Sequence, residues 1–215
     1  MTTLNLDDLR TRWQGATRHL PATTELRDEI FAELIAAYTA PDRHYHDLLH
    51  IAECLKEFEG VRHLAHDPAA LQIAIWFHDV VYDGRRSDNE ARSADAAAAA
   101  LARLGATAAF VEDVRRLIRF TCHDAGPATA DGKLIADIDL ASLAAAPEVF
   151  GENTRRIRRE YPHVPDDAFR RGRAEILARF LQRPRIYYTD VFFDRYERRA
   201  RENLEREVGT TGEHG

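Results

Sequence analysis

Cysteine is scarce in this sequence. Only two cysteines, Cys54 and Cys122, occur among 215 residues, too few for a disulfide scaffold or for a zinc site built from several thiolates. We expect both to be small core residues of a protein kept in a reducing compartment. Histidine, by contrast, occurs ten times. A metal site in this chain is therefore expected to use imidazole and carboxylate ligands.

Excess positive charge and long apolar runs are also missing. The formal net charge is −6, which argues against a broad nucleic-acid-binding surface, because such a surface needs a basic face. No stretch approaches the ~18 consecutive apolar residues of a membrane span. Residues 1–20 carry scattered charges where a signal peptide would have an apolar core. We expect a cytoplasmic protein with neither a membrane nor a nucleic-acid partner.

Strand patterns and domain linkers are equally rare. Apolar residues recur at three- and four-residue spacing along most of the chain, and the breaks between these segments are short and polar. The pattern predicts an all-α protein, a bundle of about ten helices in a single domain over residues 1–215. Its core is expected over about residues 25–145, with a helical C-terminal extension over 147–208. Residues 69–82 are nearly all apolar and predict a central helix buried on most sides.

Charge is uneven along the chain. Residues 150–215 hold 15 basic and 12 acidic residues, whereas residues 1–149 hold 15 and 24. The arginines of the C-terminal part are expected to lie mostly on solvated helix faces, paired with acidic neighbours. One or two of them gripping an anionic substrate is the alternative.

The first chemically informative group is the histidine pair His46 and His50. Four residues apart on a helix, the two side chains lie on one face with about 5–6 Å between Cβ atoms. This spacing lets both imidazoles reach one metal ion, or lets one bind metal while the other faces a substrate. Surface histidines also occur at this spacing by chance.

The second group is the adjacent pair His78 and Asp79, inside the apolar 69–82 segment. Burying an isolated carboxylate is very costly, so the pair must be neutralised, paired or metal-bound. An ion pair between Asp79 and an arginine, with a local hydrogen bond to His78, is the alternative to a metal site.

The third group is Asp137 and Asp139. Two residues apart on a helix, they face nearly opposite directions, so only one is expected to enter a site. Their apolar neighbours do not decide which one. One of these aspartates, together with His50, His78 and Asp79, gives two imidazoles and two carboxylates. This set suits zinc, manganese, iron, magnesium or nickel without distinguishing among these divalent ions, and leaves coordination positions open for water and substrate.

These groups together resemble the HD superfamily of metal-dependent phosphohydrolases, an all-helical fold. Its signature is a histidine, then a His-Asp pair, then a distant aspartate that precedes a leucine-like residue. The resemblance implies that the metal ligands are His50, His78, Asp79 and Asp139. The segment 45–50 is similar to the Tyr-His-Asn-x-x-His motif of cyclic-nucleotide phosphodiesterases, in which the first histidine donates a proton to the leaving oxygen. That likeness implies His46 as the general acid, although Asp47 replaces the asparagine.

A closer resemblance covers nearly the whole chain. The chain is similar to a bacterial family of predicted metal-dependent HD-type phosphohydrolases. The matching segments are Arg43 to His46, Trp76 to Asp83, Asn89 to Ala94, Ile118 to His123, Asp137 to Leu140, Arg158 to Tyr161 and Ile186 to Thr189. This resemblance implies a single HD-type domain and a bound metal ion, but it says little about which substrate is used.

Four further residues are candidates for roles beside the metal. Arg43 and Tyr187 are candidate phosphate or substrate contacts. Glu90 follows Ser87 by three residues, which fits a capping box at the start of a helix over 87–104, or it orients water at the site. His123 is a candidate ligand of a second metal ion, or a histidine stabilised at a helix C-terminus.

The sequence therefore predicts an enzyme that hydrolyses a phosphate ester, a nucleotide or another small phosphorylated compound. Metal-activated water attacks phosphorus, His46 protonates the leaving oxygen, and Arg43 neutralises charge. A di-iron oxygenase on the same scaffold and a non-catalytic nucleotide-sensing module are the alternatives. The partner is expected to be a small phosphorylated substrate, and a homodimer is compatible with an all-α surface.

Overall fold

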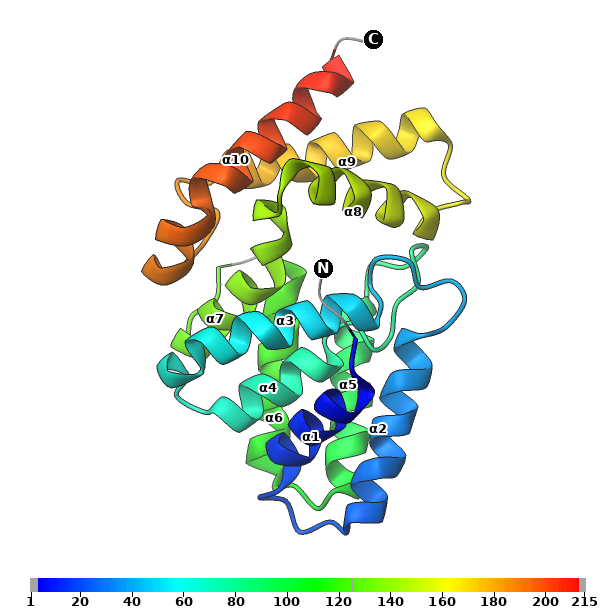
Figure 1. The fold of residues 1–215 in the computed structure, drawn as a ribbon, viewed down its shortest axis with the longest axis vertical. Helices are drawn as coiled ribbons and strands as arrows, with labels where there is room; N and C mark the ends of the chain where they lie inside the picture. The colour runs from blue at the N-terminus through cyan, green and yellow to red at the C-terminus, as the bar shows by residue number, and fades with distance from the viewer. Residues whose placement is uncertain (1–3, 125, 213–215) are drawn as a thin grey trace. The chain divides into compact units, whose positions relative to one another are not determined.

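The computed structural model describes residues 4–124 and 126–212, and within them every regular element is helical. The prediction of an all-α bundle of about ten helices is thereby confirmed. The ten α-helices are α1 (Leu6–Thr17), α2 (Thr24–Tyr38), α3 (Leu48–Val61), α4 (Pro68–Phe77), α5 (Asn89–Arg103), α6 (Ala108–Arg119), α7 (Ala130–Asp139), α8 (Pro147–Glu160), α9 (Asp166–Leu181) and α10 (Asp190–Gly212) (Figure 1). Short 3₁₀ segments follow α3, α6 and α7.

The chain divides into two compact units. The first ends at Ile138 and the second begins at Asp139, the last residue of α7. This boundary lies close to the predicted division between the core and the C-terminal extension. That both units form one HD-type domain stays a prediction.

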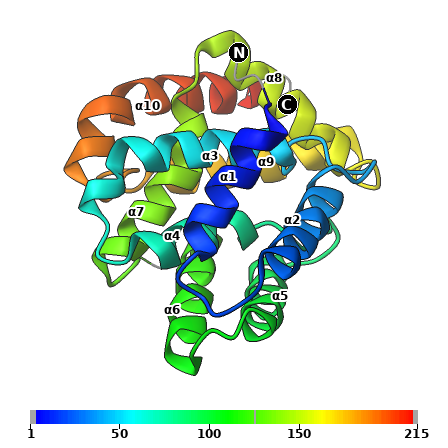
Figure 2. The same ribbon diagram turned by 60° about the horizontal axis from the view of Figure 1, so that its bottom comes forward.

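Helix α4 is the centre of the first unit. Every residue from Ala70 to Phe77 is buried, and α1, α3, α5 and α6 all pack against it. Figures 1 and 2 show α1 and α3 beside it. The rings of Trp13 and Phe31 meet Trp76 edge-on, with centroids 6.0 and 5.9 Å away. The predicted central buried helix is therefore present, although it ends at Phe77 and not at residue 82.

Helices α4 and α7 are tied together at their N-terminal ends. The buried Asp131, in the first turn of α7, accepts hydrogen bonds from the backbone N–H groups of His66 (2.7 Å) and Asp67 (2.8 Å). Asp67 is in turn the N-cap of α4, and Pro68 occupies its first turn. Each helix has ten residues. His78 directly follows α4 and Asp139 is the last residue of α7. The Asp131 hydrogen bonds therefore fix the starts of the two helices that carry these residues.

The second unit is built on α8, α9, α10 and the 3₁₀ segment Leu140–Ala144. The buried Glu197 accepts hydrogen bonds from the backbone N–H groups of Ile186 and Tyr187 and pairs with Arg201 at 2.7 Å. Tyr187 is fully buried, and its hydroxyl donates to the carbonyl of Leu140 (3.0 Å). The prediction of Tyr187 as a substrate contact was wrong, because its hydroxyl is used inside the core of this unit.

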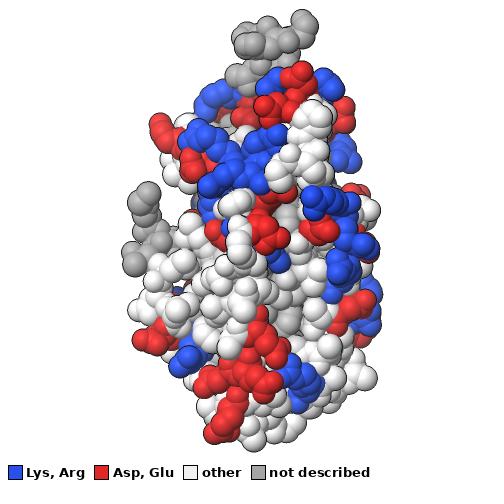
Figure 3. Space-filling model, turned by 90° about the vertical axis from the view of Figure 1, so that its right-hand side faces the viewer, with Lys and Arg blue, Asp and Glu red and all other residues white. Residues whose placement is uncertain are grey.

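Arginines of the second unit are mostly paired at the surface. Arg155 pairs with Glu152 and Arg170 with Asp167, while Arg158 binds Asp166 and the backbone carbonyl of Val164. Figure 3 shows basic and acidic side chains interspersed over this unit, in the upper part of the view. For these arginines the expectation of salt-bridged faces is confirmed. No helix among the described residues is long and apolar enough to cross a bilayer.

Candidate metal centre

His50 is positioned by the N-terminus of α3. Asp47 caps this helix, its carboxylate accepting from the N–H groups of Leu49 (2.9 Å) and His50 (3.2 Å). Aspartate and asparagine are comparable N-caps. Asp47 in place of the asparagine of the Tyr-His-Asn-x-x-His pattern therefore preserves the cap of α3. The cap places His50 in the first helical turn, where it is 3 % exposed. His46 lies before the cap, outside the helix, so the expectation that His46 and His50 share one face of a helix was wrong.

His78 and Asp79 lie in the turn that follows α4. On a continuous helix, adjacent side chains diverge by about 100°. Nevertheless, Asp79 Oδ2 lies 3.1 Å from His78 Nε2 and 3.6 Å from His50 Nε2. The two Nε2 atoms are 3.2 Å apart. Three potential ligand atoms, from α3 and from the turn after α4, thus converge on one point.

Asp139 and, unexpectedly, Cys54 join the two histidines. One ligand atom from each of His50, Cys54, His78 and Asp139 lies within 4.8 Å of all the others. Of the two aspartates, Asp139 lies in this group, whereas Asp137 is completely buried outside it; Asp79 is not in the group either, although its Oδ2 lies 3.1 Å from His78 Nε2. We refer below to His50, His78, Asp79 and Asp139 as the ligand cluster.

Cys54 is a buried core residue, as predicted, but its place beside the histidines was not foreseen, whereas Cys122, also predicted in the core, is exposed. Cys54 follows His50 by four residues, the same spacing that was noted for His46 and His50. On α3 that spacing puts its Sγ 3.7 Å from His50 Nε2. The i, i+4 relation to a candidate ligand was the available signal.

A backbone hydrogen bond orients the His78 ring. Nδ1 lies 2.9 Å from the carbonyl oxygen of Ile75, and because a carbonyl can only accept, Nδ1 carries the proton. In the neutral ring the lone pair is then on Nε2, which faces His50 and Asp79. This arrangement, an imidazole fixed by a carbonyl on its far nitrogen, is typical of metal-binding histidines.

The electrostatics of the cluster favour a positive charge between its members. Burial acts to raise the pKa of Asp79, but the imidazoles of His78, His46 and His50 outweigh it and hold the pKa below its usual range. Asp79 is 8 % exposed, so its carboxylate stays ionised only with a compensating charge nearby. A bound cation would supply that charge directly.

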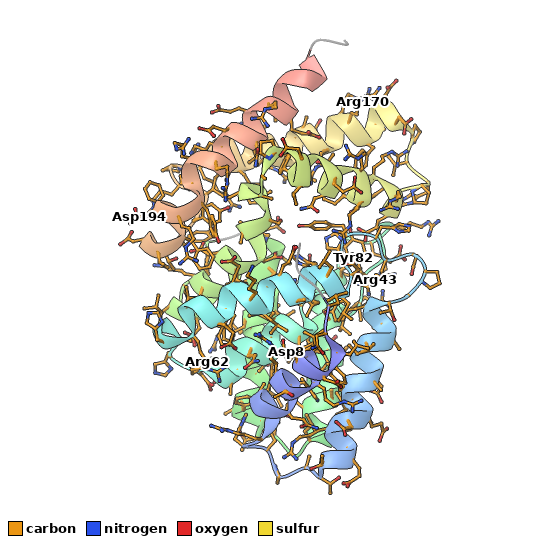
Figure 4. The ribbon with its side chains drawn as sticks, viewed as in Figure 1. Asp8, Arg43, Arg62, Tyr82, Arg170 and Asp194 are labelled. Carbon is orange, nitrogen blue, oxygen red and sulfur yellow. The ribbon has the colours of Figure 1, made fainter. Side chains whose placement is uncertain are left out.

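Arg43 fastens the turn that carries Asp79. Its guanidinium donates to the carbonyl oxygens of His46 (2.9 Å), Asp79 (2.7 Å) and Val80 (2.8 Å). It also lies over the ring of Tyr82, 5.7 Å from the centroid (Figure 4). Arg43 therefore joins the segment before α3 to the segment after α4. The predicted contact of Arg43 with substrate stays a prediction.

Two polar residues of α5 hold the same turn from the other side. Ser93 Oγ accepts from the N–H of Val81 (3.1 Å) and lies 3.2 Å from the carbonyl of the same residue. The Asn89 side chain bonds both backbone groups of Asp83. These contacts explain the Asn89 and Ser93 positions of the motif as supports of the His78-Asp79 turn.

His46 lies beside the cluster, in a stack. Its ring is stacked on Tyr82, with centroids 3.9 Å apart and planes at 23°, and its centroid is 6.2 Å from that of His50. His46 is partly exposed and near enough to Asp79 to lower the pKa of that carboxyl. A proton donor at the solvent side of the cluster would occupy such a position.

Glu90 and His123 are placed elsewhere. The predicted capping box at Ser87 was wrong, because α5 begins at Asn89 with Asp88 as its N-cap and no side chain completes the cap. The Glu90 carboxylate lies beside Cys122; burial, with this carboxylate, raises the pKa of the Cys122 thiol to about 12. His123 follows the 3₁₀ turn after α6 with a left-handed backbone (φ 58°) and is not among the side chains that converge with His50 and His78.

The spacing of the cluster fits one divalent ion. Ligand atoms about 2.1 Å from a common ion are about 3.0 Å apart at right angles and about 3.4 Å apart at the tetrahedral angle. The three distances among His50, His78 and Asp79 are 3.1, 3.2 and 3.6 Å. The donor set and its dimensions therefore suit a metal ion of this size.

Comparison of the chain with protein-family models, with curated proteins and with solved structures gave no match.

Proposed function

We propose that this chain is a metal-dependent hydrolase of phosphate esters that acts on a nucleotide or another small phosphorylated compound. The observation that carries the proposal is the convergence of His50 Nε2, His78 Nε2 and Asp79 Oδ2 within 3.6 Å of one another, next to Asp139. The resemblance of the sequence to HD-type phosphohydrolases supports the reaction class.

The ligand cluster would hold the ion. A divalent ion bound there would lower the pKa of a coordinated water and polarise a phosphoryl oxygen. The chain's part is to fix the ligands: the Asp47 cap sets His50, the Ile75 carbonyl sets the His78 ring, and the carbonyls bonded by Arg43 set Asp79.

His46 is the proton donor in this proposal. Stacking on Tyr82 holds its ring at the partly exposed side of the cluster. From there it would donate a proton to the oxygen that leaves phosphorus, and recover it from solvent. Arg43 acts as a positioning residue, because three of its hydrogen bonds go to backbone carbonyls. Glu90 as a water-orienting group stays a prediction.

Elemental analysis combined with a phosphate-release screen tests the proposal. The purified protein should contain one divalent metal ion per chain and release phosphate from at least one member of a panel of nucleotides and phosphomonoesters. His78→Ala should lose the ion, and activity should fall at least about a hundredfold. His63→Ala, at an exposed histidine outside the cluster, is the matched control and should change neither.

Two results would contradict the proposal. The first is a metal-free wild-type protein whose stability and turnover do not respond to added metal. The second is a metal-loaded protein that binds nucleotides without hydrolysing any phosphoester. Iron content with oxygen uptake would point instead to the oxygenase alternative.

A further inference from the structure

A thiol borders the ligand cluster, and it is on the same helix as one of the ligands. Cys54 is 3 % exposed, and its Sγ lies 3.7 Å from Nε2 and 3.8 Å from Nδ1 of His50. Its ligand atom is within 4.8 Å of those of His78 and Asp139 as well. The other cysteine, Cys122, is on the surface beside Glu90. The two thiols of the chain therefore have entirely different surroundings.

We propose that Cys54 is a sulfur ligand of the bound ion, so that the site selects a thiophilic ion of the zinc, cobalt(II) or iron(II) class over magnesium or manganese. The proposal rests on the metal site of the proposed function and specifies its ligands and its metal class. Hard cations such as magnesium prefer oxygen ligands, whereas a thiolate favours softer ions. The sequence alone predicted a site of nitrogen and oxygen only.

The measured separations agree with this role. With zinc–sulfur and zinc–nitrogen bonds of about 2.3 and 2.05 Å, the two ligand atoms are about 3.6 Å apart at the tetrahedral angle. The Sγ to Nε2 distance is 3.7 Å. Sγ is almost equally far from Nδ1, at 3.8 Å, so binding an ion at Nε2 requires the thiol to move toward the Nε2 side of the ring. As the metal–sulfur bond forms, the thiol proton passes to solvent.

The position on the helix supports the assignment independently of these distances. Two residues four apart on a helix present their side chains on one face, an arrangement that allows both to bind a single ion. His50 is fixed by the N-cap at Asp47, so Cys54 is fixed one turn further along α3. Cys54, His50 and His78 would then be three protein ligands, and the remaining coordination positions would be shared by a carboxylate oxygen of the cluster and water.

Cobalt(II) spectroscopy on the full chain tests the proposal without relying on activity. Metal-stripped protein titrated with Co²⁺ should develop sulfur-to-cobalt charge-transfer absorption in the near ultraviolet that saturates at one ion per chain. Cys54→Ser should bind Co²⁺ without this absorption. The matched control, Cys122→Ser, should keep it.

A comparison of metal affinities gives a second readout. Cys54→Ser should weaken Zn²⁺ binding by about tenfold or more, the scale expected for loss of a metal-site contact, and Mn²⁺ binding by less than about threefold. Circular dichroism of the metal-free variants checks that the fold is retained. Equal losses for both metals would indicate a structural effect of the substitution and would refute the assignment.

The outcomes separate this inference from the proposed function. Stoichiometric Co²⁺ binding without charge-transfer absorption, or absorption that survives in Cys54→Ser, overturns the sulfur ligand and leaves the metal-dependent hydrolase intact. A wild-type protein that binds neither Co²⁺ nor Zn²⁺ overturns both.

Discussion

Removing the Asp131 carboxylate should destabilise the first unit. Its two oxygens accept from the N–H groups of His66 and Asp67, at 2.7 and 2.8 Å, and the residue is 8 % exposed. Hydrogen bonds to a charged group each contribute about 1.5–3 kcal/mol. Since the contributions are not additive and water can reach part of the site, we expect Asp131→Ala to lower the free energy of unfolding by about 3 kcal/mol.

Asp131→Asn separates the hydrogen bonds from side-chain volume. The amide keeps one acceptor oxygen and turns its NH₂ group toward the second backbone N–H, which loses its acceptor. The loss should therefore be about half that of the alanine variant. Asp113→Ala, at an exposed aspartate paired with Arg116 on the surface, is the control and should change the free energy by no more than about 0.5 kcal/mol.

Tryptophan fluorescence during urea unfolding is the suitable assay. The chain has two tryptophans, Trp13 and Trp76, and both are fully buried in the first unit. The signal therefore reports on the unit in which Asp131 lies. An Asp131→Ala loss below about 1 kcal/mol, or equal losses for the alanine and asparagine variants, would refute the reasoning.

The contact of Asp131 with the start of α4, called here the Asp131 clamp, should also affect the proposed metal site. Helices of ten residues are about 15 Å long, and α4 and α7 both start at the Asp131 clamp and lead to ligands, His78 and Asp139. A shift at the clamped ends would be carried along each helix to those ligands. Zn²⁺ affinity should therefore fall in Asp131→Ala even where the protein remains folded, and an unchanged affinity would show that the ligand positions do not depend on this clamp.

Three further predictions concern single side chains. Asp47→Asn should be tolerated within about 0.5 kcal/mol, whereas Asp47→Ala should cost about 1 kcal/mol through loss of the α3 cap, measured in the same unfolding assay; equal costs would show that the cap is not the reason for an acid here. Cys122 should be alkylated about a thousandfold more slowly at pH 8 than a thiol of pKa 9.0, because burial and then Glu90 raise its pKa to about 12. The alkylation rate of Cys122 should rise with pH up to about pH 12 and should be higher in Glu90→Gln. Peptide mass spectrometry distinguishes Cys122 from Cys54. A rate unaffected by Glu90→Gln would contradict the role of the carboxylate. Glu197→Ala should destabilise the second unit by about 3 kcal/mol, because two backbone N–H groups and Arg201 lose a buried acceptor. Far-ultraviolet circular dichroism during thermal unfolding measures this loss, and a clearly smaller loss would contradict the role given to Glu197.

The fold class followed from hydrophobic periodicity, but the end of α4 did not. Apolar residues continue to Val81, and a helix over 69–82 was the natural prediction. The chain leaves the helix after Phe77 because other partners take its backbone groups: Arg43 binds the carbonyls of Asp79 and Val80, and Ser93 binds both backbone groups of Val81. These partners are distant in sequence, so a local pattern carries no trace of them.

The candidate site, like the fold, was predictable from the sequence only in part. His50, His78 and Asp79 could be singled out from spacing and from the cost of burying a charged pair, and the structure brings them together. Cys54 was not singled out, because an apolar helix face with one cysteine is ordinary core composition and the four-residue spacing from His50 was the one signal available. Only the packing of α3 against α4 puts that face, and its thiol, beside His78.

His78 and Asp79 lie in the turn after α4, where the backbone of the turn is held by Arg43. His78 and Asp79 are neighbours, and inside a helix their side chains would point about 100° apart. In the structure both side chains nevertheless come within 3.6 Å of His50 Nε2, and the turn after α4 brings the backbone carbonyl of Asp79 to Arg43. Loss of Arg43 would therefore disturb the proposed metal ligands before it disturbed any substrate contact. Arg43→Lys, which keeps the charge but not three directed hydrogen bonds, should weaken Zn²⁺ binding about tenfold, whereas a residue that acts only on substrate would leave Zn²⁺ affinity unchanged and raise KM alone.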